Sequence, residues 1–132
     1  MSVMDRAKLR AWWAHRQGLD GSLRESTAAE LLARTGWARS VGGSNPYLTL
    51  FSRASLSREA VDRAVAEVRI CDLPSARGCT YVLPEQDFGL GLAVAKPNVI
   101  DGDMRTASKL GVTQAEIERL CNGIESVLGD RP

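Results

Sequence analysis

Apolar side chains recur along this chain mostly at helical spacing, with one short region of strand-forming residues between the helices. Leu9, Trp12 and Trp13 recur at the three-to-four-residue interval that places side chains on one side of a helix. The same spacing, with polar capping residues in front of it, predicts four helices in the first half of the chain, over residues 5–17, 27–35, 45–54 and 57–68.

Two of these helices have clear start signals. Thr27-Ala28-Ala29-Glu30 matches a capping box, in which the Thr and Glu side chains each bond to the other's backbone N–H. Asn45-Pro46 places a capping residue directly before a proline, which suits the first position of a helix. The intervening segment Trp37–Ser44 is rich in Gly and Ser and is predicted to be a loop.

A β-hairpin is predicted over residues 69–83. Arg69–Leu73 and Arg77–Leu83 read as strands, Pro74-Ser75-Ala76 as the turn, and Pro84 stops the second strand. In that register Cys71 would face Cys79, at a spacing where either a disulfide or two reduced thiols could form. We expect reduced thiols, as is usual in a cytoplasmic protein.

The pattern after the hairpin predicts three trailing helices, over residues 84–95, 104–110 and 113–128. Pro97 is expected to end the first of them, and residues 98–103 are expected to form a polar loop. The last helix should bury the apolar side that contains Leu120 and Ile124. Helices followed by one hairpin favour a mainly α fold, a winged helix-turn-helix with additional C-terminal helices, as a single domain over residues 1–132.

Composition narrows the class of protein. The chain has 132 residues and a net charge of +1, so it is not a polycation with strong nonspecific affinity for nucleic acid. No apolar run is long enough to span a bilayer and no signal peptide is seen, so a cytoplasmic protein without a membrane partner is expected. The three cysteines form no CxxC pair and His15 is the only histidine, which predicts no metal site. No phosphate-binding glycine motif is present, and no cofactor is expected.

The loop before Pro46 is the best candidate for a functional site, because long loops in compact domains often carry function. Arg39 offers a fork of donors for phosphate or guanine, and Ser40, Ser44 and Asn45 offer short polar contacts. In the alternative interpretation Asn45 only caps a helix and Arg39 is solvated. Arg77 adds a cation on the hairpin.

The two tryptophans of the first helix are a second feature. Trp12 and Trp13 are adjacent, so we expect one in the core and the other available for a partner or a base.

Four blocks of the sequence, in order, resemble the winged-helix DNA glycosylase family, also called the AlkZ-like or YcaQ-like group: Arg16–Gly21, Gly36–Leu50, Arg77–Pro84 and Lys109–Thr113. The resemblance implies tandem winged-helix domains in the full protein, which removes alkylated bases and unhooks crosslinks. This chain would then be the N-terminal fragment of a longer multi-domain protein, with the missing C-terminal domains as partners.

The family's catalytic signature, a Gln-x-Gln or Gln-x-Asp pair, is absent from this chain. The matching segment Trp37–Val41 contains neither glutamine nor a carboxylate. Arginine stays protonated and cannot activate water, so no catalytic residue is carried over and activity as an enzyme stays uncertain.

The sequence therefore leads to three hypotheses. The first is a DNA-binding winged helix that grips duplex DNA through Arg39, its loop and the hairpin, and that is not catalytic alone. The second is a noncatalytic regulator that binds DNA as a dimer. The third is a protein-interaction module whose exposed tryptophan packs on a partner.

Overall fold

The centre of the molecule follows the order helix, strand, helix, helix, strand, strand. The structure is a computed structural model that describes residues 5–129, without the side chains of residues 97–102. The central elements are α2 (Ala28–Thr35), β1 (Ala38–Arg39), α3 (Asn45–Phe51), α4 (Arg58–Ala66), β2 (Ile70–Pro74) and β3 (Thr80–Pro84). This order is that of a winged helix-turn-helix, in which α3 and α4 are the paired helices and the β2–β3 hairpin is the wing. The predicted fold class is therefore confirmed.

The sheet contains a strand that the sequence did not predict. β1 pairs with β3, and β3 pairs with β2, so that the antiparallel order is β1-β3-β2. Ala38 lies opposite Val82 inside the segment that was expected to be a loop. A strand of two residues is too short to show an alternating pattern, so only its pairing with β3 identifies it.

The hairpin has a different register from the predicted one. Leu73 faces Tyr81 and Cys71 faces Leu83, so the prediction that Cys71 faces Cys79 is wrong. The strands are joined by residues 75–79, which we call the wing tip, rather than by Pro74-Ser75-Ala76. The chain reverses there because Arg77 and Gly78 both have left-handed backbone, with φ of 59° and 68°. Turns that use such backbone are hard to place from sequence when a non-glycine residue adopts it.

The core lies between the helices and one face of the sheet. Leu31 and Leu32 of α2, Leu50 of α3 and Ile70 of β2 are at most 1% exposed.

α2 begins with the predicted capping box: the Thr27 hydroxyl accepts from the Glu30 backbone N–H, and the Glu30 carboxylate accepts from the Thr27 backbone N–H. The bond from the Thr27 backbone is also the main cause that lowers the pKa of Glu30.

The trailing region is one long helix where the sequence predicted two. After a 3-10 turn at Glu85–Asp87, α5 runs over Phe88–Lys109 without a break at Pro97 and without the expected loop at residues 98–103. A proline removes one backbone hydrogen bond, but its φ near −65° is compatible with a helix, so it does not by itself end one. α6 (Gln114–Leu128) follows, close to the predicted 113–128.

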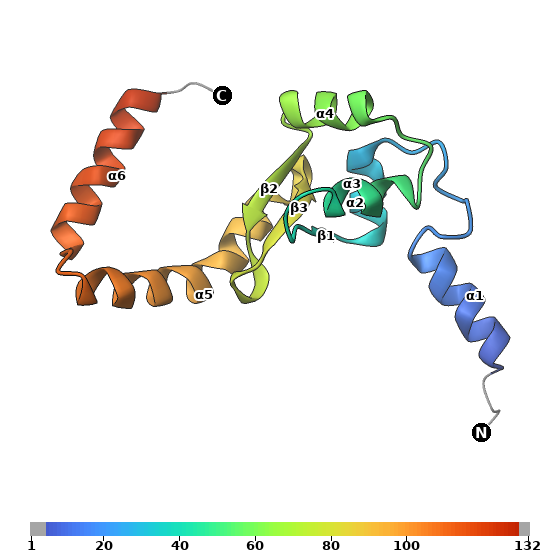
Figure 1. Cartoon of the computed structure of the whole chain (residues 1–132), viewed down its shortest axis with the longest axis horizontal. Helices are drawn as coiled ribbons and strands as arrows, with labels where there is room; N and C mark the ends of the chain where they lie inside the picture. Colours follow the sequence, from blue (N-terminus) through green and yellow to red (C-terminus); the bar gives the residue numbers. More distant parts are fainter. Residues whose placement is uncertain (1–4, 130–132) are drawn as a thin grey trace.

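α1 (Arg6–Arg16) and α6 project from opposite ends of the molecule (Figure 1). Neither helix contains a buried residue. Trp12 and Trp13 are 55% and 58% exposed, so the prediction that one of them lies in the core is wrong. The prediction that the last helix buries Leu120 and Ile124 is wrong as well, because they are 64% and 49% exposed and no element of residues 5–129 covers them.

Candidate nucleic-acid interface

Strand β1 ends at the candidate residue Arg39, and the candidate residue Ser40 follows it directly. Arg39 lies opposite Tyr81, and the backbone N–H of Ser40 donates to the carbonyl of Thr80 at 2.9 Å. Successive side chains on a strand point to opposite faces of the sheet. Val82 belongs to the core, so Arg39 and Tyr81 lie on the other face, which α5 partly covers.

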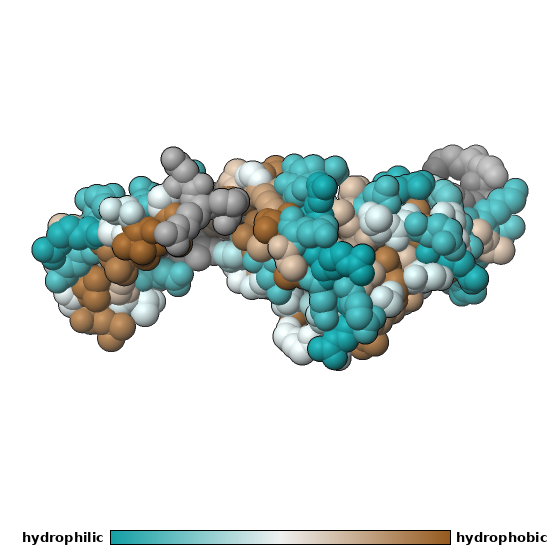
Figure 2. Space-filling view, turned by 90° about the horizontal axis from the view of Figure 1, so that it is seen from above, coloured by the Kyte–Doolittle hydropathy of each residue, from teal (hydrophilic) through white to brown (hydrophobic). Residues whose placement is uncertain are grey.

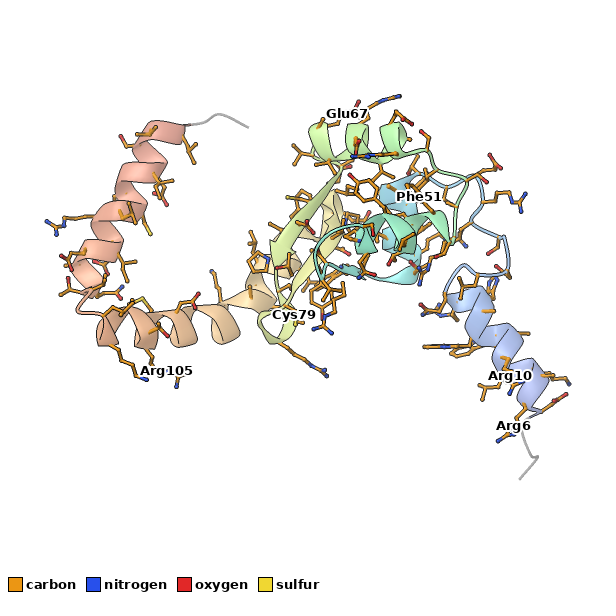
Figure 3. The ribbon with its side chains drawn as sticks, viewed as in Figure 1. Arg6, Arg10, Phe51, Glu67, Cys79 and Arg105 are labelled. Atoms are coloured by element: carbon orange, nitrogen blue, oxygen red, sulfur yellow. The ribbon has the colours of Figure 1, made fainter. Side chains whose placement is uncertain are left out.

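Arg39 and the wing tip share one end of the sheet. The Arg39 Nη2 donates to the Cys79 Sγ at 3.4 Å, and the Cys79 Sγ in turn donates to the Arg77 carbonyl at 3.9 Å. Figure 3 shows Cys79 at the end of the hairpin that lies farthest from α4 and beside α5. Arg39 and Arg77 are both exposed, and the bond to Cys79 brings the guanidinium of Arg39 to the wing tip of which Arg77 is part.

Asn45 supports this arrangement through the backbone. Its Nδ2 donates to the Arg39 carbonyl at 3.0 Å, which fixes the loop between β1 and α3. Asn45 is the first residue of α3, while Ser44 occupies the capping position, exposed and without a capping bond from its side chain. The alternative in which Asn45 only caps the helix is therefore wrong. Asn45 has a positioning role that a cap signal in the sequence could not reveal.

Ser40 is directed elsewhere. It is half-buried and lines a hollow of about 460 Å³ on the core side of the sheet, between α4, β2 and the Gly42–Gly43 turn. Val61, Val65 and Val68 form much of its wall. Arg39 and Ser40 therefore do not act on the same surface, although they are adjacent in the sequence.

Two aromatic residues next to Arg39 were not among the candidates. Trp37 and Tyr81 make an edge contact with ring centres 6.1 Å apart, and Trp37 Nε1 donates to Asp87 Oδ2 at 2.8 Å. These contacts tie β1 to the start of α5. The tryptophan two residues before Arg39 was the one sign in the sequence that pointed to these contacts. Its partners lie 44 and 50 positions away, so the sequence could not identify them.

The second helix of the helix-turn-helix, α4, would ordinarily lie in the major groove. Its exposed side carries carboxylates as well as arginines. Arg58 Nε lies 3.5 Å from Asp62 Oδ2, and the Tyr47 hydroxyl donates to Asp62 Oδ1 at 2.5 Å. That bond to Asp62 raises the pKa of Tyr47. Glu59 is exposed on the same helix and Glu67 is exposed directly after it, so the cations of α4 do not form a uniform phosphate-binding surface.

The described residues show no sign of two other kinds of site. They contain no group of three or more His, Cys, Asp or Glu residues that could hold a metal ion. None of their helices combines the length and the apolar character that crossing a membrane requires.

The winged helix fold of this chain is similar to part of one solved structure. The solved structure of Streptomyces sahachiroi DNA glycosylase AlkZ matches 97% of this chain with a TM-score of 0.69 at 20% sequence identity. The match covers 34% of the AlkZ chain, so this chain spans about a third of that protein's length. No family model and no curated protein matches the sequence.

Proposed function

We propose that this chain is a winged helix domain that binds duplex DNA through its wing tip and β1, in a context of DNA repair. The observation that carries the proposal is the bond from the Arg39 guanidinium to Cys79, which places Arg39 at the wing tip that also contains Arg77. A wing commonly contacts the sugar-phosphate backbone, and arginine forks suit phosphate oxygens. Backbone contact without base readout gives binding that depends strongly on salt and weakly on sequence.

The distribution of charge supports the wing over α4. Phosphate is repelled by Glu59, Asp62 and Glu67, all of which are exposed on or just after α4. At the wing tip, the described residues 75–79 contain no carboxylate. A duplex that approaches from the wing side therefore meets cations before it meets carboxylates.

Excision of a base is not assigned to this chain alone. The segment Trp37–Val41 offers arginine and serine where a water-activating residue would be needed. The solved AlkZ chain is a DNA glycosylase of which the matched region is about a third. In this proposal, excision would need further protein outside the winged helix.

Binding is tested by fluorescence anisotropy of a labelled duplex of about 20 base pairs across a salt series. We expect R39A and R77A each to weaken binding by about five- to tenfold near 0.1 M salt and to reduce the salt slope by about one. R63A, which removes an exposed arginine from α4, is the matched control and should change neither quantity by as much. If R63A weakens binding more than R39A and R77A do, the helix is the contact and the proposal is wrong.

Chemistry is tested separately with a duplex that contains an alkylated base. The chain should bind this duplex and its unmodified counterpart with similar affinity and release no free base. Release of the alkylated base by the isolated chain would contradict the assignment of a purely binding role.

A further inference from the structure

α1 has an apolar side that nothing in the described part of the chain covers. Leu9, Trp12 and Trp13 lie on one side of this helix and are 44%, 55% and 58% exposed. The two indole rings stack with centres 5.9 Å apart, so they form a single apolar surface. A helix of 11 residues with no buried residue is marginal in water, so α1 needs a partner to be stable.

α6 has a second uncovered apolar side. Leu120, Ile124, Val127 and Leu128 recur at helical spacing and are between 49% and 80% exposed. They line a hollow of about 470 Å³, and Gly123 leaves part of its floor open because it lacks a Cβ. Figure 2 shows apolar residues gathered on the arm at the left, where α6 lies in Figure 1.

The charges of the two helices are opposite. Arg6–Arg16 contains three arginines and one lysine and no carboxylate, and Figure 3 shows Arg6 and Arg10 exposed along α1. Gln114–Leu128 contains three glutamates and one arginine. Contact of α1 with α1, or of α6 with α6, would bring like charges together, whereas contact of α1 with α6 brings unlike charges together.

The two helices cannot meet within one copy as it is folded, because they project from opposite ends (Figure 1). Two copies in antiparallel arrangement would place each α1 against the partner's α6. This arrangement closes with two-fold symmetry and leaves neither apolar side exposed. Trp12 and Trp13 still expose 55% and 58% of their surface, so the four tryptophans of a dimer can bury roughly 300–600 Å² together. The exposed apolar residues of α6 add to this area, and a standard interface buries ~1,600 Å².

We propose that this chain forms a reciprocal dimer in which the tryptophan side of α1 of each copy packs on the apolar side of α6 of the other. The proposal does not depend on DNA binding, and it is tested in buffer without DNA. Sedimentation equilibrium of the whole chain should show a monomer–dimer equilibrium in the micromolar range. A wild-type chain that stays monomeric up to about 100 µM would overturn the proposal, because this concentration is well above a dissociation constant in the micromolar range.

The contact on α6 is tested with I124D and its control S126D. Both add one negative charge to the same turn of α6, but Ser126 lies on the side opposite Ile124. I124D should raise the dimer dissociation constant at least about tenfold, because it buries a charge in an apolar contact. S126D should leave it within about threefold. Equal effects of the two variants would contradict the assigned surface.

The identity of the partner helix is tested with W12A/W13A. This double variant should also be monomeric, with an unchanged thermal melting midpoint, because α1 contributes nothing to the core. Mixing it with I124D restores one of the two contacts, so the mixture should form dimers that neither variant forms alone. A double variant that still dimerises would show that α6 pairs with itself, and the proposal would be wrong.

Discussion

Val68 has a backbone conformation that valine rarely adopts. Its φ is 56°, directly after the end of α4. The Arg69 N–H donates to the Ala64 carbonyl at 2.8 Å, and the Val68 N–H donates to the Val65 carbonyl at 3.0 Å. These two bonds are the Schellman ending of a helix, in which Val68 occupies the position where glycine is usual. A β-branched side chain is strained there.

We therefore expect V68G to stabilise the protein by about 0.5–1 kcal/mol, because relief of strain outweighs the added freedom of the unfolded chain. The urea unfolding midpoint measures this change. V65G is the control, since Val65 lies in the last turn of α4 at similar exposure and glycine there should destabilise by about 1 kcal/mol. A lower midpoint for V68G would show that the valine side chain contributes more than the strain costs.

Individual residues of the candidate site were predictable to different degrees. Arg39 and Arg77 follow from the sequence as exposed cations in a loop and a hairpin. The position of Arg39 at the wing tip does not, because it depends on the bond from Arg39 to Cys79, 40 positions away. Ser40 was grouped with Arg39, but the strand pairing turns it to the opposite face.

At the scale of elements, α5 is held against the sheet by a close contact. A Cβ added to Gly91 would lie 2.5 Å from Leu83 Cδ2, and Leu83 is fully buried. The hydroxyl of Ser75, also fully buried, donates to the Gly91 carbonyl at 2.9 Å. The helix backbone therefore lies directly on the hairpin, and a side chain at position 91 would separate them.

G91A should destabilise the protein by about 1–3 kcal/mol, because an extra methyl group in a packed contact forces displacement. G89A is the matched control on the same helix, where an added Cβ meets nothing within 4 Å. Alanine there should stabilise by about 0.5–1 kcal/mol through its helix propensity. The unfolding midpoints of the two variants should move in opposite directions. A G91A variant as stable as wild type would mean that α5 does not pack on Leu83 in solution.

Helix starts were predictable because they depend on residues within one turn of each other. The predicted capping box at Thr27 with Glu30 is present, and Thr113 forms a second one with Glu116 at the start of α6. β1 and the continuous α5 were missed for one reason: each depends on its surroundings rather than on its own residues. β1 is a strand only through β3, and α5 continues past Pro97 although proline usually signals an end.

The whole molecule consists of a packed centre with two uncovered arms (Figure 1). The centre holds the hydrophobic core, which includes Leu31, Leu50 and Ile70. α1 and α6 contain no buried residue. Such a distribution of burial leads to a wide range of local stability. Each backbone amide exchanges its hydrogen through the local unfolding reaction that has the lowest free energy.

Hydrogen exchange measured by mass spectrometry at low micromolar concentration should show this range. Amides of α2 and β3 should exchange slowest, and those of α1 and α6 fastest. Raising the concentration into the range of the proposed dimer should slow exchange in α1 and α6 together and leave the centre unchanged. Protection that rises in only one of the two arms would contradict a contact between them.

The sequence by itself determined the helices of the first half, the capping box of α2, the existence of a hairpin and the winged helix class, because these follow from hydrophobic spacing and from short-range capping chemistry. The tertiary structure alone decided the third strand, the register of the hairpin, the meeting of Arg39 with the wing tip and the exposure of both tryptophans. Each of these depends on which segments lie side by side. Pairing between distant segments does not produce a hydrophobic periodicity in the sequence of either segment.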